Sequence, residues 1–294
     1  MQRKDRIDLF GGTILVVFSI LLGLNQALIK IVNGGFQPVF QAGLRSACAF
    51  VPLLLFALLT RKRLSLTDGS FWPGLVCGGF FAAEFLLLFL ALDYTTVARA
   101  SVFMYSMPFW VAIGAHVLIP GERLTPVRLA GLALAMVGIV WALLDDAAPA
   151  TPNAIWGDLA SLVAAMFWAG IALMVRTTRL SRATPVMQLL YQLCVSGIVL
   201  IAVAPIFGDL IREPTPLIFG IFAFQVLVII SIGFTVWLWV LSVYPASDMA
   251  SFGFLAPLFG VLFGWLLLDE PITSAIVGGL ALVSVGIILI NRRP

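Results

Sequence analysis

Long apolar runs, separated by short polar connections, fill almost the whole chain. The runs are continuous, whereas the strands of a transmembrane β-barrel alternate apolar and polar positions. A helix needs about 20 mostly apolar residues to cross the hydrocarbon core of a bilayer. Charge clusters, Gly and Pro divide the chain into ten runs of about this length. The predicted spans are 8–31, 39–60, 71–92, 97–119, 126–144, 155–175, 185–204, 217–242, 247–268 and 273–290.

The composition supports a membrane protein. Hydrophobic residues make up 62% of the 294 positions, and only 17 Lys or Arg and 14 Asp or Glu are present. Soluble proteins average about 45–50% apolar and about 25% charged residues. Ten spans leave only short connections, which excludes a large soluble catalytic domain. We therefore predict an all-α membrane protein with ten transmembrane helices.

The basic residues predict the orientation in the membrane. With the N-terminus in the cytoplasm, most Lys and Arg residues fall in cytoplasmic segments, as the positive-inside rule requires. These are Arg3, Lys4, Arg6, Arg61, Lys62, Arg63, Arg123, Arg128, Arg176, Arg179, Arg182, Arg292 and Arg293. The other side and the membrane interior hold Lys30, Arg45, Arg99 and Arg212. We expect both termini to be cytoplasmic, the 145–154 connection to face the other side, and the protein to lie in a bacterial inner membrane.

The second half of the chain repeats the first. Residues 121–125 read Gly-Glu-Arg-Leu-Thr and residues 269–273 read Asp-Glu-Pro-Ile-Thr, and similar Gly-Leu-Ala-Leu and Val-Gly-Ile segments follow both. The matched pairs include Asp8 with Asp158, Tyr94 with Tyr244, Ser101 with Ser251, Pro108 with Pro257, Glu122 with Glu270, Gly131 with Gly279 and Gly138 with Gly286. Each half, 1–146 and 147–294, has five spans, an odd number, so the halves are expected to be inverted in the membrane. Inverted repeats are typical of transporters with a site near the bilayer midplane.

These motifs resemble the drug/metabolite transporter superfamily, specifically its ten-helix members with two EamA-type domains. The resemblance covers nearly the whole chain and rests on Ser-Met-Pro-Phe at 106–109 with Gly-Glu-Arg-Leu at 121–124, and on Ala-Pro-Leu-Phe at 256–259 with Asp-Glu-Pro-Ile at 269–272. The motifs are specific to the fold and not to a substrate. Within the superfamily the chain looks most like bacterial aromatic amino acid exporters. It departs from the repeat where Pro271 follows Glu270, because Arg123 follows Glu122.

Four repeated residues are candidates for structural or gating roles. Pro108 and Pro257 fall inside the fourth and ninth spans, where proline kinks a helix and frees a carbonyl group. Irregular backbone in a membrane is tolerated where it is buried in protein or lines a cavity, so both prolines point to the working centre. Glu122 and Glu270 lie at span ends, just before the next helix starts. We expect these carboxylates to stabilise helix N-termini.

Ionisable residues inside membrane spans are functional candidates by default. His116 lies close to a span end, so we expect it at the interface. Arg45 and Glu84 lie at matched depths in the second and third spans. Two interpretations stay open: the two residues pair with each other, or Glu84 faces a cavity and binds a substrate ammonium group or a proton.

The resemblance implies that helices one, three, four, six, eight and nine surround a central cavity. On this basis the predicted substrate-binding residues are Phe18, Ser19, Glu84, Met104, Tyr105, Trp168, Trp237 and Phe252. Trp168 lies in the middle of its span, and Phe18 is its repeat partner. For each residue, ordinary core packing is the alternative.

The remaining patterns exclude several functions. A single His and no clustered carboxylates leave little for metal binding or acid–base catalysis, and the Gly-Gly pairs lack the Lys-Ser/Thr of a phosphate-binding loop. No basic stripe predicts nucleic-acid binding. An odd set of three Cys within apolar runs argues against a disulfide framework.

We therefore expect a secondary transporter that exports small amphipathic metabolites, including aromatic amino acids, and uses no cofactor. Its expected partners are the substrate and the lipid bilayer, and homo-oligomer formation stays open. A proton-coupled multidrug or organic-cation exporter of the same superfamily is the main alternative. A nucleotide-sugar or phosphate-sugar antiporter would need more cationic residues in the cavity, and a non-transporting membrane scaffold would usually show a larger soluble surface.

Overall fold

The computed structural model describes residues 8–122, 124–144, 153–244, 252 and 255–291. Its regular elements are helices, apart from an isolated bridge between Phe36 and Ile211. Some predictions fall outside the described residues. They concern Arg3, Lys4, Arg6, Arg123, Arg292, Arg293, most of the 145–154 connection, and residues 247–251 of the ninth span.

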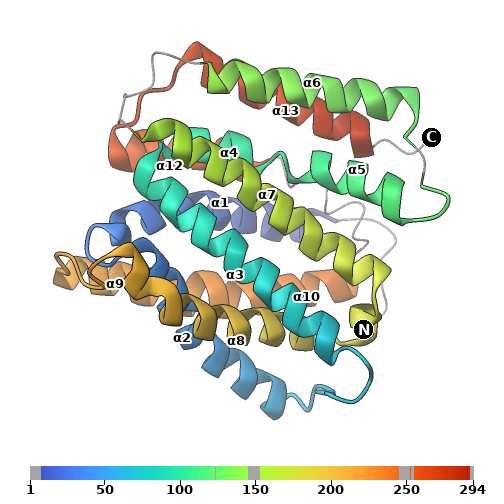
Figure 1. Cartoon of the computed structure of the whole chain (residues 1–294), viewed down its shortest axis with the longest axis vertical. Helices are drawn as coiled ribbons and strands as arrows, with labels where there is room; N and C mark the ends of the chain where they lie inside the picture. The colour runs from blue at the N-terminus through green and yellow to red at the C-terminus, as the bar shows by residue number, and fades with distance from the viewer. Residues whose placement is uncertain (1–7, 123, 145–152, 245–251, 253–254, 292–294) are drawn as a thin grey trace.

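The first half forms five spans. Its helices are α1 (Leu9–Asn33), α2 (Pro38–Leu59), α3 (Phe71–Tyr94), α4 (Val97–Met104), α5 (Met107–Leu118) and α6 (Pro126–Leu143). The second half contains α7 (Ala154–Thr177), α8 (Pro185–Val203), α9 (Pro216–Phe224), a π-helix (Gln225–Ile232), α10 (Gly233–Val243), α12 (Leu255–Leu268) and α13 (Ser274–Asn291). Figure 1 shows these helices side by side in one bundle.

Thr-Pro pairs start several of these helices. Thr125, Thr184 and Thr215 each precede a helix and accept a hydrogen bond from a backbone N–H group of its first turn. A proline follows each threonine, at a position whose N–H group has no partner within the helix. The chain therefore specifies these helix starts locally.

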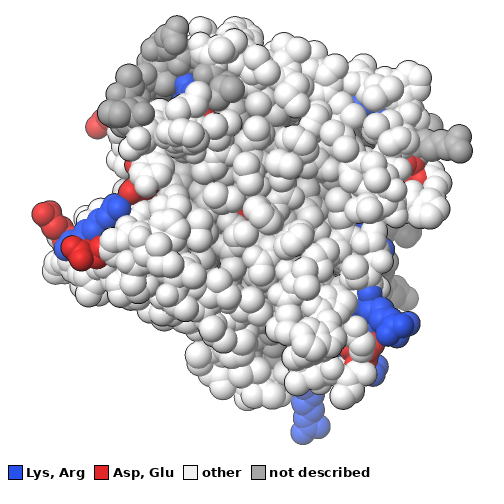
Figure 2. All heavy atoms as spheres, viewed as in Figure 1, with Lys and Arg blue, Asp and Glu red and all other residues white. Residues whose placement is uncertain are grey.

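The fold is that of an all-α membrane protein, as predicted. Among the described residues, seven helical stretches are long and apolar enough to cross a membrane, and three shorter apolar helices accompany them. These ten stretches overlap the ten predicted spans. Charged residues lie near two opposite edges of the surface in Figure 2, with a broad band between them that is almost free of charge. That band fits the hydrocarbon core of a bilayer.

The packing of α6 against α13 indicates that a two-fold rotation relates the two halves and that they run in opposite directions. These helices pack together at one edge of the bundle (Figure 1). A Cβ atom on Gly138 would lie 2.7 Å from the carbonyl oxygen of Gly279, and one on Gly286 would lie 2.6 Å from that of Gly131. Because Gly131 matches Gly279 and Gly138 matches Gly286 in the repeat, one contact is the image of the other. The two equivalent helices run antiparallel.

This close contact makes Gly138 sensitive to substitution. Gly138→Ala forces a methyl group against backbone and is expected to lower the free energy of unfolding by about 1–3 kcal/mol. Nothing lies within 4 Å of a Cβ atom built on Gly79, in α3. Gly79→Ala should therefore leave stability unchanged or raise it by up to about 1 kcal/mol through helix propensity. Thermal unfolding in detergent measures both; equal shifts would contradict the close packing.

The fourth span is broken at the predicted proline. Helix α4 ends at Met104, α5 begins at Met107, and Pro108 occupies the first turn of α5. Pro257 is the third residue of α12 as described, and the residues needed to judge a kink there lie outside the described ranges. The eighth span is also irregular, because a π-helix separates α9 from α10. The apolar pattern did not predict this segment.

Candidate functional site

A cavity of about 1210 Å³ lies between the two halves of the bundle. All eight residues predicted to bind substrate line this one cavity. They are Phe18 and Ser19 of α1, Glu84 of α3, Met104 of α4, Tyr105 at the break in the fourth span, Trp168 of α7, Trp237 of α10, and Phe252 before α12. Their role in binding stays a prediction, while their position around a common space is a property of the fold.

Aromatic rings from both halves cover the cavity wall. Phe18 stacks on Trp237 with ring centroids 4.9 Å apart, and Tyr105 meets Trp168 edge-on at 6.0 Å. The two residues of each pair lie far apart in the sequence, and the fold brings them together. Such surfaces provide broad apolar contact together with the indole N–H and phenol O–H groups.

A polar cluster also lines the cavity, formed by Asn25 and Gln26 of α1, Arg45 of α2 and Glu84 of α3. The side-chain oxygen of Asn25 accepts hydrogen bonds at 3.2 Å from both Arg45 Nη1 and Gln225 Nε2. Gln225 is the first residue of the π-helix. The Gln26 oxygen accepts a hydrogen bond of 2.6 Å from the Ser101 hydroxyl.

Arg45 and Glu84 are the two charged members of the polar cluster. They are 2% and 5% exposed, and the guanidinium group of Arg45 also lies over the rings of Phe85 and Phe89. Of the ion pairs within 4.0 Å that the described residues form, none joins Arg45 to Glu84. Both side chains thus line one cavity without an ion pair within 4.0 Å between them, and the role of Glu84 in binding an ammonium group or a proton stays a prediction.

The cavity reaches the surface at the turn between α5 and α6, which we call the open end. His116, Gly121 and Arg176 line this end and are exposed. Glu122 forms an ion pair with Arg176 there, and its side chain is 37% exposed. The interfacial position of His116 stays a prediction.

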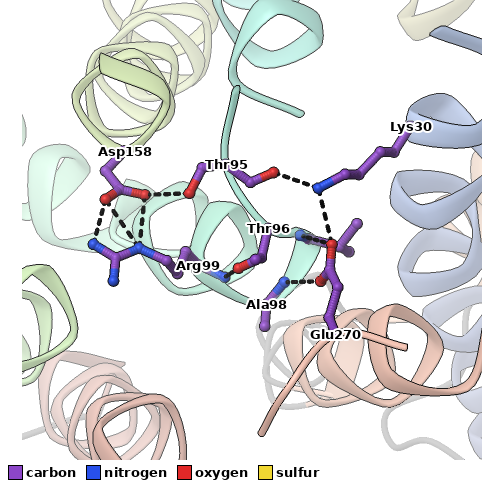
Figure 3. A network of polar contacts seen from close by, with 8 residues as sticks. Lys30, Thr95, Thr96, Ala98, Arg99, Asp158 and Glu270 are labelled. Carbon is purple, nitrogen blue, oxygen red and sulfur yellow. Dashed lines mark hydrogen bonds and ion pairs between the residues drawn. The ribbon is translucent and has the colours of Figure 1, made fainter. Parts of the chain in front are cut away.

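At the opposite end, which we call the closed end, Glu270 joins α4 to α1 (Figure 3). Its carboxylate accepts hydrogen bonds from the backbone N–H groups of Val97 and Ala98, at 3.0 and 3.3 Å, and from Lys30 Nζ at 3.0 Å. Lys30 also donates to the carbonyl oxygen of Thr95 at 2.6 Å. Glu270 thus stabilises a helix N-terminus, as expected. The helix is α4, however, and not the following helix α13.

A second charged pair at the closed end joins α4 to α7. Arg99 Nε donates to both carboxylate oxygens of Asp158, at 3.1 and 3.0 Å, and Arg99 Nη2 also contacts this carboxylate. The Thr95 hydroxyl donates to Asp158 at 2.7 Å (Figure 3). Arg99 and Asp158 are both buried.

Near the surface of the closed end, Arg212 donates to both carboxylate oxygens of Asp93 at 2.9 Å. Arg212 lies in the connection that precedes α9, and Asp93 lies at the end of α3. The hydrogen bond to Asp93 raises the pKa of Arg212 above its ordinary value. This ion pair therefore links the two halves of the chain near the surface of the closed end.

Sequence reasoning missed several of these polar residues. Asn25, Gln26 and Gln225 are polar positions inside apolar spans, which is the signal that could have identified them. Asp158 was visible only as the repeat partner of Asp8. Its buried partner Arg99 is 59 positions away along the chain.

These features define a polytopic membrane protein of two inverted repeats, with a solute-sized cavity that reaches the surface at one end and ionic contacts between helices at the opposite end. The sequence profile of the EamA-like transporter family matches residues 9–144 and 155–292. The chain belongs to this family of the drug/metabolite transporter superfamily.

Relatives extend over nearly the full chain. The "Uncharacterized transporter YoaV" of Bacillus subtilis is 24% identical over 278 residues, covering 94% of both chains. A "Probable amino-acid metabolite efflux pump" of Escherichia coli is 27% identical over 300 residues, covering 98% of this chain and 94% of its own. A protein of known crystal structure has the same fold, with a TM-score of 0.64 and 20% sequence identity. The match covers 94% of each chain.

Proposed function

We propose that this protein is a secondary transporter that exports small amphipathic metabolites, foremost amino acids including aromatic ones, by alternating access. The observation that carries the proposal is the cavity, whose aromatic walls surround a small polar cluster. Aromatic walls suit the apolar part of such a solute, and the polar cluster suits its head group. The name "Probable amino-acid metabolite efflux pump", which relatives of Escherichia coli and Salmonella typhimurium carry, supports this substrate class.

The proposed orientation follows the distribution of basic residues. Both termini lie in the cytoplasm of a bacterium, in whose inner membrane the protein resides. With ten spans, the start of α1 and the turn between α5 and α6 are on one side. The open end of the cavity then faces the cytoplasm, where an exporter must collect its substrate.

Transport in this scheme requires two linked movements. The contacts of Glu270 and Asp158 at the closed end must separate, and the α5–α6 turn with its neighbours must close over the open end. The break at Tyr105 and Ser106 and the π-helix both lie in spans beside the cavity. Irregular helix segments of this kind are common at functional hinges.

An organic-cation exporter is the second candidate. Glu84 offers a buried carboxylate in a cavity that aromatic residues also line, and both kinds of group attract cations. Flux measurements in liposomes containing the purified protein, with a panel of amino acids, organic cations and sugar phosphates, discriminate the candidates. Counterflow of amino acids is the expected result. Flux of none of these solutes would contradict the proposed function.

Trp168 provides a residue-level test of the same proposal. Trp168→Ala removes an aromatic face from the cavity wall, so we expect amino-acid flux to fall at least about tenfold, which corresponds to 1.4 kcal/mol of lost binding. Trp265→Ala is the control, because Trp265 is exposed on the outer surface of α12 and does not line the cavity. Folded yield is measured beside flux. Lost protein with normal flux per folded molecule would identify Trp168 as a core residue only.

A further inference from the structure

The polar cluster holds two opposite charges with unused hydrogen-bonding atoms. Within the described part of the chain, Nε of Arg45 and Oε2 of Glu84 have no hydrogen-bond partner. Both side chains are more than nine-tenths buried and line the cavity. Burying a charged group without a partner is costly. These atoms are therefore suited to a ligand that brings its own charges.

The two charges lie on neighbouring parts of the same wall. The guanidinium carbon of Arg45 is 4.9 Å from the ring centre of Phe85 and 4.6 Å from that of Phe89. Phe85 directly follows Glu84 in α3, and Phe89 lies about one helical turn further along. Arg45 thus rests against the stretch of α3 that carries Glu84, without forming an ion pair with it.

We propose that Arg45 and Glu84 together form a binding site for a zwitterionic α-amino acid, in which Arg45 donates to the carboxylate and Glu84 accepts from the ammonium group. This inference rests on the proposed function and narrows it to solutes that carry both charges. Asn25 holds the Arg45 guanidinium in place through its side-chain oxygen. The planar guanidinium group suits a carboxylate because it can donate two parallel hydrogen bonds.

Charge selects the zwitterion over singly charged solutes. An organic cation could pair with Glu84 but would be repelled by Arg45. An organic anion could pair with Arg45 but would be repelled by Glu84. Either one leaves a buried charge without its counterion. In an α-amino acid the nitrogen and the carboxyl carbon are only about 2.5 Å apart, as standard bond lengths give. A short ligand with both charges matches two opposite charges that line one cavity and form no ion pair with each other.

The rest of the cavity would accept the amino-acid side chain. The pairs Phe18–Trp237 and Tyr105–Trp168 offer apolar ring faces to it. A volume of about 1210 Å³ is large for any single amino acid. Recognition would then be strict at the charged head group and broad at the side chain.

The first test uses the unmodified full-length protein. Isothermal titration in detergent compares L-phenylalanine with 2-phenylethylamine, which lacks the carboxylate, and with 3-phenylpropionate, which lacks the ammonium group. We expect phenylalanine to bind about 10- to 100-fold more tightly than either analogue, since each analogue loses a hydrogen bond between charged groups. Equal affinity for phenylalanine and either analogue would overturn the inference.

The second test assigns the two roles. Arg45→Gln should bring phenylalanine and 2-phenylethylamine to equal affinity within about threefold, and Glu84→Gln should do the same for phenylalanine and 3-phenylpropionate. The exposed residues Arg182 and Glu213 give matched controls, Arg182→Gln and Glu213→Gln, which should keep the wild-type ratios. Each ratio is measured within one protein sample, so a partly unfolded preparation does not distort it. If Arg45→Gln lowers the affinities for phenylalanine and for 2-phenylethylamine by the same factor, the assignment of Arg45 to the carboxylate is contradicted.

Liposome flux separates this inference from the proposed function. Wild-type protein that transports organic cations or 2-phenylethylamine as well as phenylalanine would overturn the zwitterion site and leave an amphipathic exporter. Wild-type protein that transports no solute of the panel would overturn the proposed function itself. If Arg45→Gln does not fold, the wild-type comparison and Glu84→Gln still decide the matter.

Discussion

Asp158→Ala is expected to lower the free energy of unfolding by about 3–5 kcal/mol, because it breaks the buried ion pair between Arg99 and Asp158. Thr95 loses its hydrogen-bond acceptor in the same variant. Unfolding in detergent, followed by circular dichroism, measures the loss. Unchanged stability would contradict the role of this pair in joining α4 to α7.

A double-mutant cycle shows whether the loss belongs to the pair. Arg99→Met keeps much of the side-chain length without the charge, so Arg99→Met/Asp158→Ala should lose less stability than the sum of the single variants. We expect a coupling of about 0.5–3 kcal/mol. Arg212 and Asp93 form a control pair that also uses both carboxylate oxygens, and their side chains are 38% and 19% exposed. Breaking an exposed pair should change stability by only about 0–1 kcal/mol.

Glu270→Ala is expected to open the closed end. It removes three hydrogen bonds to a carboxylate that is 6% exposed. Hydrogen bonds to charged groups contribute about 1.5–3 kcal/mol each, and water can replace part of this once the end opens. A net loss of one such hydrogen bond shifts the equilibrium between the closed and the opened state of this end about tenfold or more.

Thiol labelling measures this shift. Cys48, Cys77 and Cys194 are first replaced by alanine, and Met104→Cys then places a thiol on the cavity wall. A membrane-impermeant reagent added outside the cell should react at least about tenfold faster when Glu270→Ala is present. In inside-out vesicles the parent should react through the open end. Faster labelling of the parent from outside than from inside would reverse the proposed orientation.

The repeat supplies the control for Glu270. Glu122 is its repeat partner, but at the open end its ion pair with Arg176 is partly exposed, with side-chain exposures of 37% and 43%. Exposed ion pairs contribute about 0–1 kcal/mol. Glu122→Ala should therefore leave labelling from outside near the parent rate. An effect equal to that of Glu270→Ala would contradict a special role for the closed end.

The spans and the break at Pro108 could be predicted because their signals are local. An apolar run of sufficient length defines a span without reference to the rest of the fold. A proline disrupts the helix that contains it. The π-helix at Gln225–Ile232 has no such signal, because its hydrogen-bond pattern leaves the apolar composition unchanged.

The partners of the charged residues could not be predicted, because a span gives the depth of a residue and not the direction in which it points. Arg45 and Glu84 were placed at matched depths, yet Arg45 turns toward Asn25 and the rings of α3. Glu270 was expected to act on the helix that follows it. Its carboxylate oxygens instead accept hydrogen bonds from the N-terminus of α4, more than 170 positions earlier in the chain. Contacts at such separation depend on how the two halves pack.

The closed end has a consequence for the response to voltage. The charged pairs that the described residues form there, Lys30–Glu270, Arg99–Asp158 and Arg212–Asp93, each consist of one positive and one negative side chain. One elementary charge that crosses the whole membrane field gains or loses about 2.3 kcal/mol per 100 mV. If both side chains of each pair move in the same direction, their contributions cancel and little net charge crosses that field. A strong dependence of turnover on membrane potential would then report the charge of the transported solute or of a coupled ion.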